Sequence, residues 1–352
     1  MQSTTVAIVG CGMAGLSAAR LLGRAGYQIV LYEKSRGVGG RMATRRVNGC
    51  TLDHGAQVIK PDGTLLADLM LGECFCEDLV QVTAPVRLYT ANGEILPPDP
   101  ERAVERQFAY RSGITALPKR MLQIMPHERV TLKTETRVSR IEEAAGHLLL
   151  YGETGTLIGE AHAVILTAPG PQSADLLEAS RLHEDRSRSI RALRSVEYTA
   201  CLTVLLGYAG PAPEPPGYAL LAAERETPLL WLAFEHVKAR ERAPGGEALL
   251  IAQLGPEYSR DHYASPDDAV IRTTLEALHA LFGETYAVPL WAQVKRWRYS
   301  QPTGEVGFDE VNPAGCRVVV CGDALRPGRG RVHQAFLSGM ETAEYLMRSG
   351  VE

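Results

Sequence analysis

The sequence lacks any apolar stretch of the roughly 20 residues that a membrane-spanning helix requires. The segment that begins at Met1 has no basic region followed by a long apolar one, so we expect no secretion signal. The longest apolar runs, 201–206 and 318–321, have the length of buried strands. We therefore expect a soluble, cytoplasmic protein without a membrane partner.

An excess of positive charge is missing as well. The 37 Lys and Arg residues are outnumbered by 41 Asp and Glu residues, which gives a formal net charge of −4. Proteins that bind nucleic acid need a basic face for the phosphates, so nucleic acid is not an expected partner. With 352 residues and 45% hydrophobic content, the chain is long enough for two globular domains.

Cysteine and histidine show no metal-ligand spacing. Seven cysteines are scattered through the chain, and Cys74 and Cys76 are too close together for a CxxC pair. The nine histidines form no cluster either, so we predict no metal site and inert, buried thiols. The sequence also offers no Ser/His/Asp or Cys/His arrangement and no carboxylate pair, which hydrolytic or proton-abstracting mechanisms need.

The strongest local pattern lies at residues 4–33, which read as strand, glycine turn, helix and strand. In the turn, Gly10 permits a tight bend, Gly12 lets a pyrophosphate approach the backbone, and Gly15 lets helix and strand pack closely. The second strand ends at Glu33, where a carboxylate can accept hydrogen bonds from both hydroxyls of a ribose. The pattern predicts a parallel βαβ unit that binds the ADP part of a dinucleotide.

A second pair of glycines, Gly39 and Gly40, follows Glu33 closely and is flanked by Arg36 and Arg41. NAD dehydrogenases have no need of such a pair. A long cofactor that lies across the domain needs a second close approach to the backbone and an arginine near its diphosphate. The two glycine motifs together favour FAD.

Farther along the chain, three short β-type runs occur at 130–138, 147–151 and 163–167, and a strand at 317–323 precedes a helix at 333–347. These patterns predict an α/β fold in which a Rossmann-type FAD-binding domain is interleaved with a mixed-sheet α+β substrate domain. The first domain would comprise 1–60, 128–170 and 303–352, and the second 61–127 and 171–302. The active site is expected between them.

Seven short motifs carry a resemblance that covers nearly the whole chain: 39–42, 53–57, 113–115, 164–169, 295–302, 322–324 and 335–339. Together they resemble the renalase-like members of the flavin amine oxidase superfamily. The run at 295–302 (Lys-Arg-Trp-Arg-Tyr-Ser-Gln-Pro) is the most specific of them, because the others are shared more broadly among flavin amine oxidase folds.

This resemblance implies FAD, bound non-covalently, as the cofactor. Asp323 would hydrogen-bond the ribityl chain, and the N-terminus of the helix that follows would lie at the flavin ring. The implied cofactor-binding residues are Gly10, Gly12, Met13, Ala14, Gly15, Glu33, Lys34, Arg36, Gly40, Arg41, Met42, Gln57, Val138, Gly322, Asp323, Val332 and Ala335.

The reaction implied by the resemblance is oxidation of the 2- and 6-dihydro isomers of NAD(P)H to NAD(P)+, by hydride transfer to the flavin with O2 as the acceptor and hydrogen peroxide as a product. Because the product ring becomes aromatic, such a reaction needs orientation more than acid–base catalysis. Gln57 could bind an amide, and aromatic rings could wall a flat nicotinamide-type substrate. The candidate catalytic residues are Gln57, Trp297, Tyr299 and His333, with His54 nearby in sequence.

Several alternatives stay open at this point. Trp297 and Tyr299 lie two apart on a predicted strand, so both would face one side, which is either a pocket or the core. The basic loop 326–333 suits a phosphate-bearing substrate or plain solvation, and His333 stands where bacterial relatives carry an acidic residue. An amine oxidase or desaturase of another small substrate and a non-catalytic FAD-binding scaffold are the competing functions, and the oligomeric state is undetermined.

Overall fold

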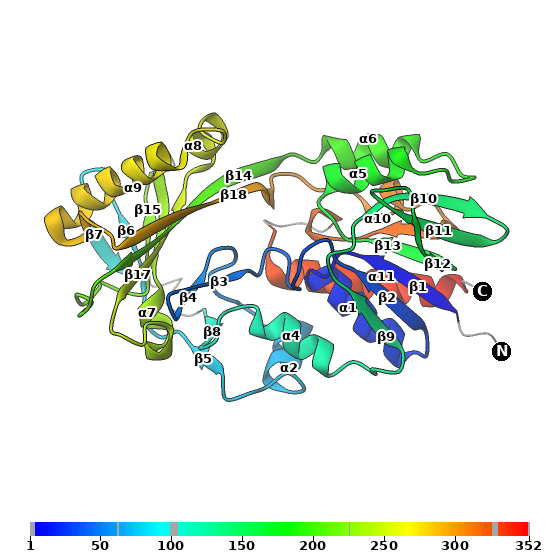
Figure 1. Ribbon diagram of the computed structural model, residues 1–352, viewed down its shortest axis with the longest axis horizontal. Helices are drawn as coiled ribbons and strands as arrows, with labels where there is room; N and C mark the ends of the chain where they lie inside the picture. The colour runs from blue at the N-terminus through cyan, green and yellow to red at the C-terminus, as the bar shows by residue number, and fades with distance from the viewer. Residues whose placement is uncertain (1–3, 62, 99–104, 225, 326–329, 351–352) are drawn as a thin grey trace.

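The computed structural model describes residues 4–61, 63–98, 105–224, 226–325 and 330–350, and shows two lobes side by side (Figure 1). The N- and C-terminal segments lie in one lobe, together with the glycine motifs. The two long strands β14 and β18 run from the other lobe towards it. Among the described residues, no helix combines the length and apolar character needed to cross a bilayer.

The first lobe is built on a five-stranded sheet in the order β19-β13-β1-β2-β9. All of its pairings are parallel, so the predicted βαβ unit and the Rossmann-type α/β fold are confirmed. Parallel strands are buried on both faces, which explains why the sequence shows continuous apolar runs here. The strands are β1 (Thr5–Val9), β2 (Gln28–Tyr32), β9 (Val130–Lys133), β13 (Ala163–Leu166) and β19 (Val318–Val320).

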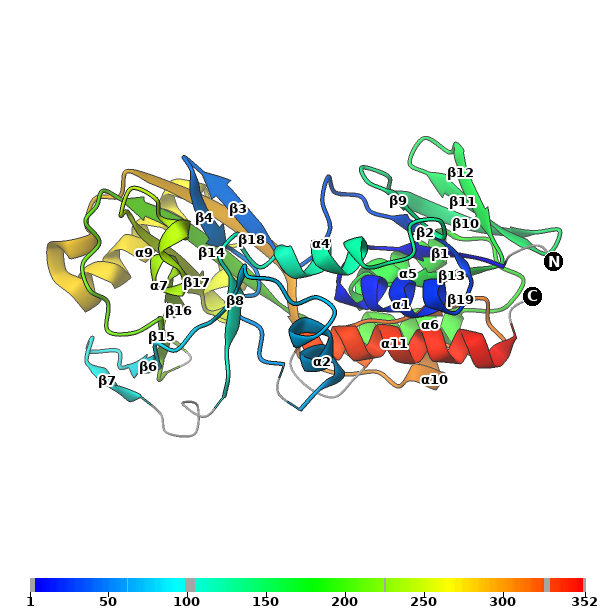
Figure 2. The same cartoon turned by 90° about the horizontal axis from the view of Figure 1, so that it is seen from below.

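Each face of this sheet has its own apolar core. Val6 and Ile8 point into the core under α1 (Met13–Arg24) and α11 (Val332–Ser349), whereas Ala7 points into the opposite core. That second core is covered by a three-stranded antiparallel sheet and by two helices (Figure 1), whereas Figure 2 shows α1 and α11 on the near side. These elements are β10 (Val138–Ala144), β11 (His147–Gly152), β12 (Leu157–Ala161), α5 (Gly170–Ala179) and α6 (Ser187–Ser195).

The second lobe contains a seven-stranded mixed sheet in the order β18-β14-β17-β16-β15-β6-β7, with β15 and β6 parallel. One face is covered by α9 (Asp267–Phe282), and the other face packs on β4 (Cys50–Asp53). The strands are β6 (Val86–Tyr89), β7 (Ile95–Pro98), β14 (Tyr198–Tyr208), β15 (Ala219–Ala222), β16 (Leu229–Phe234), β17 (Ala248–Leu254) and β18 (Trp291–Pro302).

The remaining elements lie between and around the two sheets. They are β3 (Thr44–Val47), α2 (Leu65–Leu71), β5 (Leu79–Gln81), β8 (Phe108–Tyr110), α4 (Ala116–Gln123), α7 (Glu235–Lys238), α8 (Pro256–Asp261) and α10 (Phe308–Val311). Apolar side chains of α2 and α4 enter the core under α1 and α11, so these helices pack on the first lobe. The division 1–60, 128–170, 303–352 against 61–127, 171–302 stays a prediction.

Helices α1 and α11 touch at a glycine. A Cβ atom added to Gly339 would lie 2.0 Å from the carbonyl oxygen of Ala14 and 2.2 Å from the hydroxyl of Ser17. The same hydroxyl donates a hydrogen bond of 2.7 Å to the carbonyl of Phe336. This contact joins the N-terminal and C-terminal units of the lobe.

We predict that Gly339→Ala destabilises the protein, although alanine is the better helix former. The methyl group would have to push two backbones apart, which costs about 1–3 kcal/mol. The midpoint of urea unfolding would measure the effect. Gly304→Ala is the matched control, because nothing lies within 4 Å of its added Cβ; equal midpoints for the two variants would contradict the packing argument.

Candidate active site

The turn between β1 and α1 has the geometry that its three glycines suggest. Gly10 has a φ of +109°, in the region that favours glycine. A Cβ on Gly15 would lie 2.1 Å from the carbonyl oxygen of Gly10, so this position holds helix and strand in close contact. At Gly12 nothing lies within 4 Å of an added Cβ. The backbone beside Gly12, at the start of α1 with Met13 and Ala14, is therefore open to a diphosphate.

The carboxylate of Glu33 is held at the end of β2. It is only 7% exposed, and its two oxygens accept the backbone N–H groups of Cys11 (3.0 Å) and Ser35 (2.8 Å). Each carboxylate oxygen can accept a further hydrogen bond, so the group still suits the two hydroxyls of a ribose. The residues that follow, Lys34 and Arg36, are exposed.

The second glycine pair rests directly on the first glycine turn. The N–H of Gly39 donates to the carbonyl of Cys11 (2.8 Å), and a Cβ on Gly40 would lie 3.4 Å from the Cα of Gly12. Met42 is buried in the core beneath. The two loops thus form one backbone surface of the kind that a long dinucleotide requires, which means that the residues present fit FAD.

Arg41 links the second glycine loop to the C-terminal unit. Its guanidinium forms a bidentate ion pair with Asp323, with both N–O distances 2.8 Å, and also donates to the carbonyl of Ser300 (3.1 Å). Burial alone would lower the pKa of Arg41, but the adjacent Asp323 carboxylate outweighs it and raises that pKa. Asp323 is itself nearly buried, and the preceding Gly322 donates its N–H to the hydroxyl of Ser338 (3.0 Å).

Three further predicted cofactor residues lie on β10 and α11. Val138 is buried at the start of β10. Val332, His333 and Ala335 are half-buried in the first turn of α11, the helix whose N-terminus was expected at the flavin. Of the basic loop 326–333, residues 326–329 lie outside the described part of the chain.

Strand β18 brings the specific motif 295–302 against the glycine loops. The indole N–H of Trp297 donates to the carbonyl of His54 (2.9 Å), and the two rings stack with centroids 5.5 Å apart. Tyr299 instead meets the edge of Tyr198. Regular alternation along β18 would put the rings of Trp297 and Tyr299 on one side of the strand. The alternation is interrupted here, because the pairing of β14 with β18 shifts between Cys201, which pairs with Trp297, and Thr199, which pairs with Gln301.

A row of polar side chains crosses the face of the second sheet that packs on β4. The strand register aligns Lys295 of β18, Thr203 of β14 and Gln253 of β17. Gln253 donates to the carbonyl of Gly55 (3.0 Å), which fixes the row against the loop after β4. Cys201 lies next to it on β14, and burial raises the pKa of its thiol to about 11, so it stays a neutral packing group.

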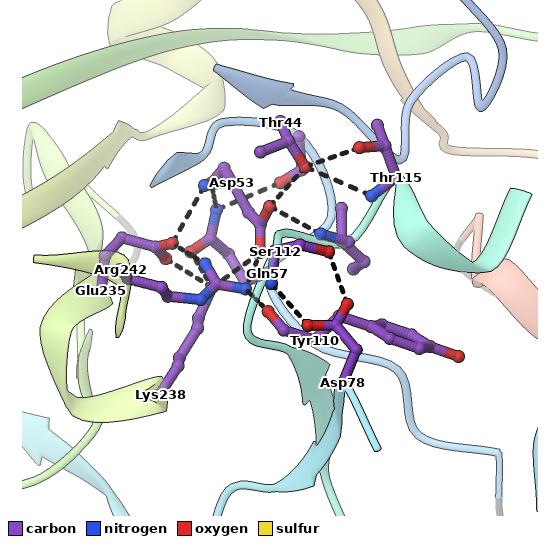
Figure 3. A network of polar contacts seen from close by, with 12 residues as sticks. Thr44, Asp53, Gln57, Asp78, Tyr110, Ser112, Thr115, Glu235, Lys238 and Arg242 are labelled. Atoms are coloured by element: carbon purple, nitrogen blue, oxygen red, sulfur yellow. Dashed lines mark hydrogen bonds and ion pairs between the residues drawn. The ribbon is translucent and has the colours of Figure 1, made fainter. Parts of the chain in front are cut away.

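Four charged side chains, Asp53, Glu235, Lys238 and Arg242, form a fully buried cluster behind this loop (Figure 3). Arg242 pairs with Asp53 (2.7 Å) and with Glu235, and Lys238 pairs with Glu235. Burial alone would raise the pKa of Asp53, but Arg242 and Lys238 lower it below its usual range. The cluster contains two acids and two bases, so its charges balance, as burial demands.

Gln57 faces this cluster. Its amide oxygen accepts from Lys238 Nζ (3.4 Å), and its amide nitrogen donates to the carbonyls of Asp53 and Gly55. The side chain is 8% exposed. Its role in binding a substrate amide or the cofactor stays a prediction, and the structure adds that Lys238 fixes the orientation of the amide.

The sequence analysis did not single out Glu235, Lys238 and Arg242. Glu235 and Lys238 are three positions apart on α7, after the buried strand β16, and Arg242 follows in a separate 3-10 turn. Such a run of charges ordinarily belongs to a solvated helix face. The burial of Glu235, Lys238 and Arg242 becomes evident only from the cluster that they form with Asp53, which lies far away in the sequence. Lys295 belongs to the motif 295–302 but was not given a role, and Arg45 was not identified.

His54 is held in its neutral form. Its pKa is lowered to about 4, first by burial and then by the positive charges of Arg45 and Lys295, against a smaller opposing effect of Asp53. Its Nδ1 atom is buried and has no hydrogen-bond partner among the described residues. A neutral imidazole beside an aromatic ring can donate or accept a hydrogen bond but contributes no charge.

We predict that this histidine makes the protein less stable as the pH falls. Because the folded-state pKa lies below the unfolded value, the unfolded chain binds a proton first and gains stability between about pH 6.5 and pH 4. From about pH 7 to about pH 5, the free energy of unfolding should drop by about 2 kcal/mol more in the wild type than in His54→Asn. Urea unfolding at both pH values measures this difference, and parallel losses would show that His54 is not responsible.

Comparison with known proteins gives matches in sequence and in fold. A 4,4'-diapophytoene desaturase of Staphylococcus haemolyticus is 41% identical over 54 residues, which is 15% of this chain and 11% of that protein. A putrescine oxidase of Kocuria rosea is 45% identical over 65 residues, 18% of this chain and 14% of that protein. The matched segments thus cover only a small part of these curated relatives.

The fold matches over nearly the whole length. A putative protoporphyrinogen oxidase of Exiguobacterium sp. 255-15 superposes with a TM-score of 0.76 at 17% identity, covering 98% of this chain and 99% of that one. This likeness concerns the fold alone.

Two family models match the sequence. One, described as an NAD(P)-binding Rossmann-like domain, covers residues 8–70, and the other, described as flavin containing amine oxidoreductase, covers residues 86–347. They confirm the predicted FAD cofactor and the class of FAD-dependent oxidoreductase. Since the second model spans well over half of the sequence, the chain belongs to the flavin-containing amine oxidoreductase family.

Proposed function

We propose that this protein is a renalase-like FAD-dependent oxidase that converts the 2- and 6-dihydro isomers of NAD(P)H to NAD(P)+ with O2 as the acceptor. When bound, FAD supplies the oxidant, so that the dihydronicotinamide, O2 and a proton yield NAD(P)+ and hydrogen peroxide. The fit of the two glycine loops and the motif at 295–302 support the proposal.

The charge pattern beside Trp297 carries this choice of substrate. The carboxylates on the side of Trp297 are already paired, Asp53 with Arg242 and Asp323 with Arg41. The ionised group at the aromatic ring is instead a cation, because Lys295 Nζ lies 4.9 Å from the centroid of Trp297. A cationic amine would be repelled here, whereas a flat dihydronicotinamide carries no positive charge on its ring.

The protein's own residues orient the substrate and perform little proton transfer. Trp297 offers a flat apolar wall, and its indole N–H is occupied by the carbonyl of His54. His54 stays neutral at physiological pH, and Gln57 is fixed by Lys238. This arrangement suits a reaction that is driven by aromatisation of the product ring, in which orientation supplies most of the catalysis.

An amine oxidase or desaturase activity is the second candidate, and it is favoured by the family itself and by the similarity to a putrescine oxidase. Such an enzyme would bind an amine through an aromatic cage or an anionic pocket. The described neighbours of Trp297 do not provide the anion, which is why we place this candidate second.

Anaerobic mixing of the purified holoprotein separates the candidates. We expect the flavin absorbance to be bleached after mixing with the 2- and 6-dihydro isomers of NAD(P)H, and to stay unchanged after mixing with putrescine and other common amines. Bleaching by amines alone would overturn the proposal. A flavin that no reductant of either kind bleaches would indicate an FAD-binding scaffold.

Retention of FAD tests the assignment of Glu33. Glu33→Arg replaces the ribose acceptor by a cation that cannot accept a hydrogen bond and leaves the N–H groups of Cys11 and Ser35 without their partner. We expect the variant to purify without flavin, as measured by the ratio of absorbance at the flavin and protein bands. Glu160→Arg, an exposed position on β12, is the control and should keep its flavin; full flavin in Glu33→Arg would show that the ribose lies elsewhere.

A further inference from the structure

We propose that Arg45, His54, Lys295 and Trp297 form a subsite for a flat heteroaromatic compound that carries an anionic group, a phosphate monoester or a carboxylate. The proposal rests on the proposed function, which names nucleotides whose dihydronicotinamide ring carries phosphates, and it assigns residues to the anionic part of such a compound. The four residues come from the β3–β4 hairpin, the loop that follows it and strand β18.

The register of the β3–β4 hairpin places Arg45 next to His54. Arg45 pairs with Leu52, and the N–H of His54 continues the ladder by donating to the carbonyl of Ala43 (3.0 Å). In a hairpin, paired residues and the residues two positions along from them lie on the same face. Arg45, Leu52 and His54 therefore share one face, on which Arg45 and His54 are diagonal neighbours. That face packs on the second sheet, because Leu52 lies in the core between them.

The same face of the second sheet carries Lys295. Its row partners Thr203 and Gln253 lie beside Leu205 and Ile251, which pack in the core with Leu52. Lys295 and Trp297 are two positions apart on β18, and the amine lies over the indole. The cations Arg45 and Lys295 therefore approach the stacked rings of His54 and Trp297 from two different elements.

Neither cation has a carboxylate partner among the residues that the structure describes. The ion pairs found there involve neighbouring arginines instead, such as Arg296 with Asp267 and Arg41 with Asp323. Burial and both cations lower the pKa of His54, and its buried Nδ1 has no hydrogen-bond partner in the described part of the chain. A buried polar atom without a partner commonly awaits a ligand or a water.

An anion satisfies all of these groups together. A phosphate or carboxylate can pair with both cations and accept a hydrogen bond from a neutral imidazole, while Trp297 stacks on the attached ring. A cationic ligand would add to the repulsion between Arg45 and Lys295. The chemistry of the subsite therefore selects an acidic derivative of the ring over a neutral one.

Binding to the oxidised holoprotein tests the subsite without turnover. Two matched pairs of compounds whose pyridine rings are uncharged at neutral pH would be titrated while the flavin spectrum is recorded: 3-pyridylmethyl phosphate with 3-pyridylmethanol, and nicotinate with nicotinamide. We expect 3-pyridylmethyl phosphate, or nicotinate if the anion is a carboxylate, to bind at least about tenfold more tightly than its neutral counterpart. Lys295→Met and Arg45→Met should each remove most of that preference and leave the affinity for the neutral compounds nearly unchanged.

Arg46→Met is the matched control. Arg46 is the next residue of the same strand, but its guanidinium points to the other side of the hairpin and donates to the carbonyl of Ser112 (2.7 Å). It should keep the full preference for the anionic ligand. Lys295→Gln and Arg45→Gln serve as second variants if a methionine variant loses its flavin.

The outcomes distinguish this inference from the proposed function. Preference for the anionic ligand that survives both Lys295→Met and Arg45→Met would overturn the subsite, as would a lack of saturable binding by both anionic compounds. Flavin bleaching by dihydronicotinamide isomers tests the reaction separately. A preference that depends on Lys295 and Arg45 in a protein whose flavin those isomers do not bleach would support the subsite and overturn the reaction.

Discussion

The ion pair between Arg41 and Asp323 joins the three parts of the chain that make up the candidate site. Arg41 belongs to the second glycine loop, Asp323 follows the last strand of the first sheet, and the carbonyl that completes the contact, of Ser300, belongs to β18 of the second lobe. A bidentate pair of this kind fixes the orientation of both groups, because the planar guanidinium matches the carboxylate. This contact holds the end of β18 against the second glycine loop.

The buried cluster around Asp53 has a similar role on the other side of the loop 54–57. Asp53 accepts hydrogen bonds from Thr44, from the N–H of Ile114 and from Arg242, so its carboxylate is bound by three separate segments. Burial of four charges costs more than it returns unless every partner is present. The cluster therefore specifies one arrangement of the loop that carries His54 and Gln57, and it ties that loop to α7 of the second lobe.

The electrostatics of the two halves of the site differ. On the dinucleotide side, the carboxylate of Glu33 and the open backbone at Gly12 suit ribose hydroxyls and a diphosphate. On the side of Trp297, the carboxylates are neutralised by arginine, and the remaining charges are positive. Membership of the amine oxidoreductase family thus coexists with a wall that does not suit an amine.

The sequence by itself determined the cofactor. The βαβ unit, the glycine conformations and the carboxylate of Glu33 arise within about 40 consecutive residues, where spacing along the chain translates directly into geometry. Tertiary structure alone decided the surroundings of His54, Gln57 and Trp297. They depend on contacts between residues far apart in the sequence, such as Arg41 and Asp323, which are 282 positions apart, or Asp53 and Arg242, which are 189 apart. The motif 53–57 identified Gln57 as a candidate. No local pattern shows that its amide faces Lys238, because this contact depends on how the two lobes pack.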